Sequence, residues 1–349
     1  MPARLEISTS IFRDNVRAVM GRVAPGEMML VTKDDAYGHG LEWAVREAYA
    51  VGARWIGSYD VPSALRVRAL LPDVRIFAWE TSSADEVAEA IRAGVDLGVG
   101  TAGYLRRVIA EAERTGRRAL VHLKIDTGLH RNGIRPEDWA DAVTEARRAE
   151  DAGLLHVAGV WSHLAEASDD EDDAARGEFA HAVDVLRDAG GTPEHLHLTA
   201  SAASWARPEL RGTLSRIGAF CYGIRSADGP DLDGIRPAAS LRADTVDVQD
   251  DRVRIDVGAL DGLPSNLAGA VLGGAVLGSA ALGGPDAPRI LHVDGTWTDL
   301  SRWAGASTGD SVTVFGGDGP SATDLAERID TVGEEILTRV SPLVPRRYS

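Results

Sequence analysis

The chain has 349 residues, enough for one large barrel or for two domains with a buried core. Its 37 basic and 53 acidic residues give a formal net charge of −16, which argues against binding nucleic acid or an anionic membrane through a broad basic surface. We expect a cytoplasmic protein without a metal cluster, because no apolar run approaches the roughly 20 residues of a membrane helix, no leader pattern opens the chain, and Cys221 is the only cysteine.

Short β-rich runs alternate with amphipathic helical stretches over the first two thirds of the chain. The helical stretches, such as 41–53, 84–94 and 136–153, close on glycines of the kind favoured at helix C-termini. Eight strand–helix units match a (β/α)8 TIM-like barrel in number and span, although a doubly wound open sheet gives the same local pattern. The predicted strands are residues 28–33, 55–60, 74–79, 95–100, 119–126, 156–164, 196–201 and 216–223.

The pattern changes after about residue 236 to alternating, glycine-punctuated runs with little helical period before residue 320. We therefore expect an α/β barrel domain over residues 1–235 and a smaller C-terminal β-domain over 236–349, with residues 1–10 as a candidate to pair with the β-domain. The alanine-, glycine- and leucine-rich segment 266–288 is too broken for a membrane span and is expected to form strands and turns.

The densest acidic run is "ASDDEDDAAR", residues 167–176. It lacks the glycine and the oxygen-ligand spacing of a calcium-binding loop. We expect a solvated helix start rather than a metal site.

Polar side chains lie at the ends of several predicted strands. In a barrel the C-terminal strand ends converge on one mouth, so these positions are candidates for function. They are Lys33 and Tyr37 after the first strand, Lys124, Asp126, Thr127 and Arg131 at and beyond the fifth, His163 at the sixth, Ser201 at the seventh, and Arg216 with Gly218 at the eighth.

Taken singly, these residues have ordinary structural explanations. A strand-end lysine is more often solvated than bound to a cofactor, His163 fits a hydrogen-bonded core histidine, and Ser201 fits a helix N-cap. Together, a lysine, several hydrogen-bonding groups and a phosphate-binding position after strands seven and eight describe a pyridoxal phosphate pocket, because backbone N–H groups commonly bind phosphate in that barrel region.

Five motifs in this order resemble the alanine racemase family: "VTKDDAYGHG", "HLKIDTGLHRNGI", "GVWSHLA", "HLTASAA" and "SRIGAFCYG". The resemblance covers essentially the whole chain and is most specific through residue 223. It implies a pyridoxal 5'-phosphate-binding barrel followed by a β-domain. It also implies a head-to-tail homodimer acting on a small amino acid, in which each active site combines the barrel of one chain with the β-domain of the other.

The resemblance also assigns the cofactor contacts. Lys33 would form the internal aldimine and serve as one acid/base. Tyr37, Ser201 and the backbone of Gly218 and Ala219 would hold the phosphate.

Three further basic or polar residues receive roles from the same resemblance. Arg216 would face the pyridine nitrogen and, as a permanent donor, keep the ring a weaker electron sink than a pyridinium. Arg131 would lie near the cofactor phenolic oxygen and the substrate carboxylate, oriented by Lys124, which is often carbamylated in this family. His163 would belong to the polar network on the opposite face.

The β-domain departs from the family pattern. Racemisation needs a proton removed on one face and delivered on the other, and the family takes its second base from a tyrosine in a "GYADGYPR"-like motif. The counterpart here is "GALDGLPS", with Ala259 at the tyrosine position, and no tyrosine lies between residues 223 and 347. The family's "MDQ"-like segment corresponds to Val293–Gly295, and its late phosphate-binding tyrosine to Glu334.

The sequence is compatible with three functions. The first is an amino-acid racemase in which His163, His292, Asp294 or an ordered water replaces the tyrosine. The second is a one-base pyridoxal phosphate enzyme, such as an epimerase, lyase or decarboxylase, that uses Lys33 alone. The third is a cofactor-binding protein without turnover.

Overall fold

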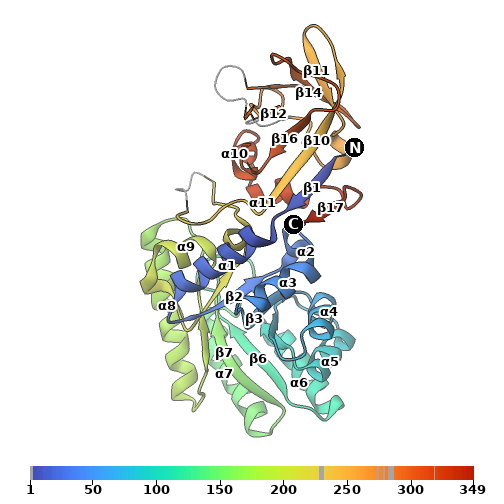
Figure 1. The fold of residues 1–349 in the computed structure, drawn as a ribbon. Coiled ribbons are helices and arrows are strands. Elements are labelled where there is room, and N and C mark those ends of the chain that lie inside the picture. Colours follow the sequence, from blue (N-terminus) through green and yellow to red (C-terminus); the bar gives the residue numbers. More distant parts are fainter. Residues whose placement is uncertain (1–2, 228–231, 273–274, 278–279, 282–286, 318) are drawn as a thin grey trace. The chain divides into compact units, whose positions relative to one another are not determined.

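The computed structural model describes residues 3–227, 232–272, 275–277, 280–281, 287–317 and 319–349. The chain forms two compact units (Figure 1). The barrel unit comprises Val19–Lys33 and Leu41–Gly218, and the β-unit comprises Met1–Ala18, Asp34–Gly40 and Ala219–Ser349.

The barrel unit contains one sheet of eight parallel strands. Its order, β8-β7-β6-β5-β4-β3-β2-β9, follows the chain without the reversal of a doubly wound sheet, and β9 pairs with β2. The sheet is nearly closed, and the predicted barrel is confirmed. Its strands are β2 (Glu27–Val31), β3 (Trp55–Tyr59), β4 (Arg75–Ala78), β5 (Asp96–Val99), β6 (Ala119–Lys124), β7 (Leu155–Trp161), β8 (His195–His197) and β9 (Leu214–Ile217).

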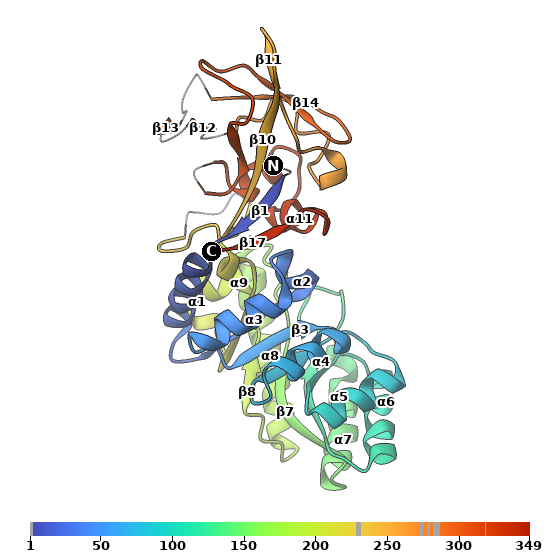
Figure 2. The same cartoon turned by 45° about the vertical axis from the view of Figure 1, so that its right-hand side comes forward.

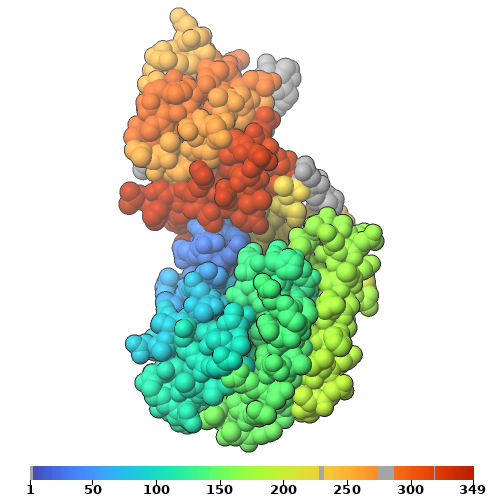
Figure 3. Space-filling model, turned by 180° about the vertical axis from the view of Figure 1, so that it is seen from behind, coloured from blue at the N-terminus to red at the C-terminus, as the bar shows by residue number. Residues whose placement is uncertain are grey.

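Helices follow the strands and cover the outside of the barrel (Figure 2). Ser83 and Glu86 form a capping box at the start of α5, and Gly94 ends that helix in the left-handed conformation. The part of the barrel unit visible in Figure 3 changes colour in chain order, as expected where successive helices lie side by side. These helices are α3 (Leu41–Ala50), α4 (Val61–Leu70), α5 (Ala84–Ala93), α6 (Ala102–Thr115), α7 (Pro136–Asp151), α8 (Asp169–Asp188) and α9 (Ser201–Ala206).

Large side chains fill the barrel interior. Met29, Trp55, Phe77, Trp161 and Leu214 form one buried cluster contributed by five strands. The barrel is therefore a packed core, and its functional groups must lie at the strand ends or within this packing.

The N-terminal strand belongs to the β-unit. β1 (Arg4–Ile7) pairs antiparallel with β10 and parallel with β17. Helix α1 (Thr9–Val23) then leads along the chain into the barrel unit. The other described strands of this sheet are β10 (Ala239–Val248), β11 (Arg252–Ile255), β12 (Ala275–Leu277), β13 (Ala280–Ala281), β14 (Ile290–Val293), β15 (Thr298–Ser301), β16 (Ser311–Phe315) and β17 (Arg346–Tyr348), and the helices are α10 (Ala322–Glu327) and α11 (Gly333–Thr338).

The remaining sequence-based expectations concern longer segments of the chain. The acidic run begins α8, capped by Ser168, as expected. Part of 266–288 lies outside the described residues. The domain boundary at residues 235 and 236 stays a prediction. None of the described helices is both long and apolar enough to cross a bilayer.

Candidate active site

Lys33 follows the first barrel strand directly and begins an unusual turn. The next four residues, Asp34 to Tyr37, all have φ between 52° and 56°, and the Gly38 N–H donates to the Asp34 carbonyl at 2.9 Å. Left-handed backbone costs L-residues roughly 1–2 kcal/mol each. Strain of this kind is concentrated at functional sites, so the turn after Lys33 supports a functional role for this segment.

Lys124, the last residue of β6, is buried next to an aromatic ring. Its Nζ lies 4.6 Å from the centroid of Trp161. Burial, and then the charges of Arg216 and Arg131, lower the pKa of this amine to about 8. The neutral, nucleophilic form of Lys124 is therefore more populated near neutral pH than in an exposed lysine.

Arg131 is exposed in the loop that follows β6. Asp126 organises this loop by accepting hydrogen bonds from the N–H groups of Gly128 and His130, each at 3.1 Å. The loop thereby holds Arg131 close enough to affect the pKa values of Lys124 and Arg216.

Arg216, on β9, is buried and bonded on both terminal nitrogens. One donates to the His197 carbonyl at 2.7 Å and the other to the Ser162 carbonyl at 2.7 Å. Each also contacts a histidine, Nδ1 of His197 at 3.1 Å and Nδ1 of His163 at 3.3 Å. Burial lowers the pKa of Arg216 to about 9, which leaves it charged at neutral pH.

His163 contacts Arg216 and lies within electrostatic range of three other basic groups of the barrel unit. Its pKa falls to about 3, first because of burial and then because of these positive charges. His163 is consequently a neutral imidazole near neutral pH. The four groups are Arg216, Arg131, Lys124 and Lys33.

Ser201 and Gly218 meet at the ends of strands β8 and β9. The Gly218 N–H donates to Ser201 Oγ at 3.2 Å. The hydroxyl hydrogen of Ser201 is therefore available to an acceptor other than Gly218. The predicted Lys124, His163, Arg216, Ser201 and Gly218 thus all lie at the C-terminal ends of barrel strands.

Tyr37 and Ala219 belong to the β-unit. The Tyr37 ring centroid lies 5.0 Å from that of Tyr222. Burial, followed by the charge of Glu334, raises the pKa of Tyr37, so its hydroxyl stays protonated and can donate. The carboxylate of Glu334 therefore lies close enough to influence Tyr37.

Ala259 lies beside the segment Val293–Gly295. The Ala259 N–H donates to the Asp294 carbonyl at 2.8 Å, and the Leu260 N–H donates to the Gly295 carbonyl at 2.8 Å. The His292 ring nitrogen lies 3.9 Å from a carboxylate oxygen of Asp294. The backbone of Asp294 thus contacts the position that lacks the tyrosine, and His292 lies near the Asp294 side chain.

Sequence reasoning missed three buried polar residues beneath the mouth: Asp96, His122 and His197. The alternation of side chains along a strand could have indicated them, because residues two apart on a strand share a face. His122 shares a face with Lys124 in "HLK", as His195 does with His197 in "HLH". Among the described residues, no three His, Cys, Asp or Glu side chains are grouped to hold a metal ion.

A nearly closed parallel barrel with four basic side chains at or just beyond its strand ends, joined along the chain to a β-unit, defines a class of barrel proteins suited to an anionic ligand. The family models for the alanine racemase N-terminal and C-terminal domains match residues 7–226 and 246–348. The chain belongs to the alanine racemase family, whose members depend on pyridoxal 5'-phosphate.

Individual relatives resemble this chain over nearly their whole length. The chain is 37% identical to the alanine racemase of Thermobifida fusca over 369 aligned positions, covering 99% of this chain and 98% of the relative. The alanine racemase structure from Streptomyces coelicolor A3(2) aligns with a TM-score of 0.92 and 29% identity, covering 99% and 98% of the two chains. The one from D-cycloserine-producing Streptomyces lavendulae gives a TM-score of 0.90 and 29% identity, covering 100% and 97%.

Proposed function

We propose that the protein is a pyridoxal phosphate-dependent racemase that interconverts the L and D forms of a small amino acid. The observation that carries this proposal is the contact of Arg216 with His163 at the strand ends of the barrel unit, with Arg131, Lys124 and Lys33 close enough to lower the pKa of that ring. A phosphorylated cofactor and a substrate carboxylate together supply several negative charges. The donor set therefore fits the cofactor of the family.

The phosphate end of the cofactor is assigned to residues whose hydroxyl groups can donate hydrogen bonds. Ser201 accepts from Gly218 and keeps its own hydroxyl hydrogen to donate. Tyr37 stays protonated because burial raises its pKa. We assign both hydroxyls, with the backbone N–H groups of Gly218 and Ala219, to the phosphate oxygens.

The ring end is assigned to Arg216. When bound, pyridoxal phosphate withdraws electrons from the Cα of a covalently attached amino acid and makes its proton acidic. Arg216 has donors only, so it would donate to the pyridine nitrogen without transferring its proton. This limits electron withdrawal and favours return of the proton to Cα over transamination.

Lys33 would anchor the cofactor covalently and, when released by the substrate, move the Cα proton on one face. His163 is neutral and carries a lone pair on Nδ1, because that atom accepts from Arg216. It would hold its own proton on Nε2. We assign it to the proton-bearing network of the other face.

Lys124 is proposed to be carbamylated and to orient Arg131. Its lowered pKa supplies a neutral amine, which adds to carbon dioxide to form a carbamate and release one proton. The resulting negative charge would pair with Arg131, which lies nearby. A carbamate signal in ¹³C NMR with labelled bicarbonate, absent in Lys124→Met, tests this assignment.

The second base is the point at which this chain differs from its family. The Asp294 backbone contacts Ala259 and His292 lies near the Asp294 side chain, and either residue, or a water that they hold, would replace the tyrosine. The proposal includes a head-to-tail homodimer, in which the partner's β-unit completes the site, and a cytoplasmic location. A one-base enzyme using Lys33 alone is the second candidate, favoured by the alanine at position 259.

The first experiment is a cofactor and activity test on the purified protein. With saturating pyridoxal phosphate, the wild type should show a visible absorption band that borohydride fixes onto Lys33, and it should racemise at least one of a panel of L-amino acids. Lys33→Ala should lose both. A wild type without the band would exclude every pyridoxal phosphate function.

A further inference from the structure

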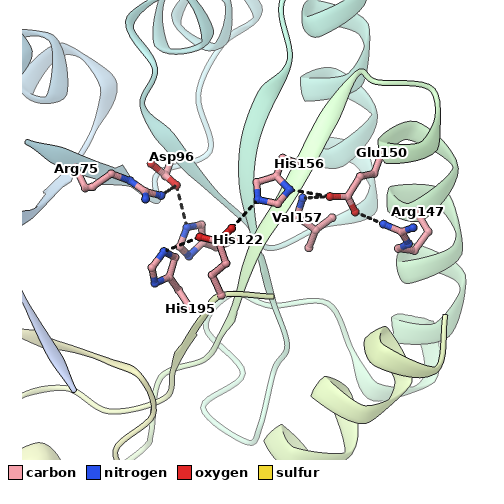
Figure 4. Close-up of polar contacts among 9 residues, drawn as sticks. Arg75, Asp96, His122, Arg147, Glu150, His156, Val157 and His195 are labelled. Carbon is pink, nitrogen blue, oxygen red and sulfur yellow. Dashed lines mark hydrogen bonds and ion pairs between the residues drawn. The ribbon is translucent and has the colours of Figure 1, made fainter. Parts of the chain in front are cut away.

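A line of hydrogen bonds connects Arg216 to the opposite end of the barrel interior. Arg216 contacts Nδ1 of His197 at 3.1 Å, and Nε2 of His197 lies 2.8 Å from Nδ1 of His122. Nε2 of His122 lies 3.1 Å from Oδ1 of Asp96, which also accepts from Arg75 at 2.9 Å. Figure 4 shows the Arg75, Asp96 and His122 part of this line.

The chemistry of the end groups fixes every proton along the line. A guanidinium only donates, so His197 must carry a lone pair on Nδ1 and its proton on Nε2. That proton is donated to His122 Nδ1, which leaves the His122 proton on Nε2. A carboxylate only accepts, so Asp96 takes this last hydrogen bond, and each imidazole accepts at Nδ1 and donates from Nε2.

The line runs through a region closed to water. The side chains of Asp96, His122 and His197 are completely buried. Phe77 lies against both imidazoles, with ring centroids 5.0 Å from His122 and 5.2 Å from His197. In such surroundings hydrogen bonds are strong and polarise one another, so the carboxylate of Asp96 polarises the whole line of hydrogen bonds.

A purely stabilising role is a weak explanation for this arrangement. A buried ion pair or polar chain is often no more stable than well-packed apolar side chains of similar volume. The second carboxylate oxygen of Asp96 is buried without a hydrogen-bond partner among the described residues, which carries a further cost. The arrangement instead fixes the direction of every hydrogen bond in the line. Each group donates to the next one, from Arg216 towards Asp96.

We propose that Asp96, His122 and His197 are positioning residues that hold Arg216 as a charged, oriented donor and so set how strongly the cofactor ring withdraws electrons. The role for the cofactor rests on the proposed function, in which Arg216 faces the pyridine nitrogen. Asp96 acts as the anchor because it supplies the only negative charge on the line, and Arg75 holds Asp96 ionised from the barrel rim.

A neighbouring pair at the same end of the barrel unit provides a control. Glu150 accepts from His156 Nδ1 at 2.9 Å and contacts Arg147, as Asp96 does with His122 and Arg75 (Figure 4). His156 also contacts Glu194, Glu194 contacts His195, and the His195 ring stacks on that of His122 with centroids 5.7 Å apart. Among the described contacts this second pair makes no hydrogen bond to the line itself. Glu150→Gln therefore removes the same kind of charge without breaking a hydrogen bond of the line.

The first measurement needs no cofactor. In apoprotein labelled with ¹⁵N-histidine, the ring-nitrogen shifts of His122 and His197 should both report the neutral Nε2–H tautomer, assigned with His122→Gln and His197→Gln. A proton on Nδ1 of either ring, or a charged ring at neutral pH, overturns the line of hydrogen bonds whatever the protein's activity.

The second measurement tests the effect on the cofactor. Asp96→Asn keeps an acceptor for His122 but removes the charge. In the pyridoxal phosphate-loaded protein it should shift the wavelength and the pH midpoint of the visible band and lower kcat by roughly 10-fold, the size typical of groups that act through a neighbour. Glu150→Gln should leave the band unchanged.

The outcomes separate the two proposals. A wild type without a visible band contradicts the proposed function. The tautomers of His122 and His197 still test the line of hydrogen bonds in that case. A band that is the same in wild type and Asp96→Asn overturns the coupling alone. If Asp96→Asn does not fold, Arg75→Gln replaces it, because the Arg75 side chain is 41% exposed at the rim and its loss weakens the anchor from outside.

Discussion

The Arg216 guanidinium donates to Nδ1 of His163 at 3.3 Å, which forces that ring nitrogen to carry a lone pair. The same guanidinium is the largest electrostatic cause, after burial, of the lowered pKa of His163. The two residues are therefore coupled in both geometry and charge.

Removing the charge of Arg216 should raise the pKa of His163. In Arg216→Gln the imidazole loses its nearest positive charge, so its pKa should move upward from about 3. Burial remains the largest cause of the shift, so the pKa should stay below the ordinary value near 6.5. Titration of ¹⁵N-histidine signals, with His163→Gln for assignment, measures the change. An unchanged pKa would mean that Arg216 does not act on this ring.

The protein should lose stability as the pH falls below about 6.5. Burial lowers the pKa of His39 and of His195 to about 4, whereas both rings accept a proton near pH 6.5 once the chain is unfolded. The unfolded state therefore binds more protons between these values, and the free energy of unfolding decreases with falling pH. Urea titrations at about pH 7, 5.5 and 4.5 measure this slope.

A pair of variants isolates the buried contribution. His195→Gln should reduce the pH slope, because a buried ring that resists protonation has been removed. His181→Gln changes a ring that is exposed on α8, so it should leave the slope as in the wild type. Equal slopes in all three proteins would contradict the assignment to buried imidazoles.

Glu334→Gln should bind pyridoxal phosphate more tightly than the wild type. The Glu334 carboxylate acts on Tyr37, which we assign to the phosphate, so its charge repels the ligand. Removing one like charge near the surface should strengthen binding about 5-fold. Equilibrium dialysis of the apoprotein measures this affinity. Glu335→Gln, one residue further along α11, should bind as the wild type does, and a weaker Glu334→Gln would refute the repulsion.

Ala259→Tyr should increase the rate of alanine racemisation. Ala259 is exposed, so a larger side chain there displaces no buried packing. A restored second base is worth roughly 10²- to 10⁴-fold, and an imperfectly placed tyrosine should recover part of that gain. Leu260→Tyr, at the adjacent exposed position, should give none. Equal rates in the two variants would show that a tyrosine at position 259 does not act as the second base.

Much of the barrel could be predicted because each strand carries a local signal. Its strands are short apolar runs, and helices such as α5 have a capping box at one end and a glycine at the other. Lys33, Lys124 and Arg216 could be placed because the strand ends of a parallel barrel converge.

Other features depend on contacts that a local pattern does not contain. The sequence indicates residues 1–10 as a candidate to pair with the β-domain, but no local pattern identifies the partners of β1, which are β10 and, from the other end of the chain, β17. The left-handed turn from Asp34 to Tyr37 contains no glycine, the residue that usually signals such backbone. Asp96, His122 and His197 come from three strands, and only the closed barrel brings them together.

Solvent deuterium incorporation at Cα tests the central claim most directly. The wild type with saturating pyridoxal phosphate would be incubated in deuterium oxide with a panel of L- and D-amino acids. We predict that at least one amino acid gains deuterium at Cα with inversion, and that Lys33→Ala abolishes this exchange. Deuterium entering with retention alone would show one-base chemistry. No exchange with any amino acid would contradict the racemase and leave a cofactor-binding protein without turnover.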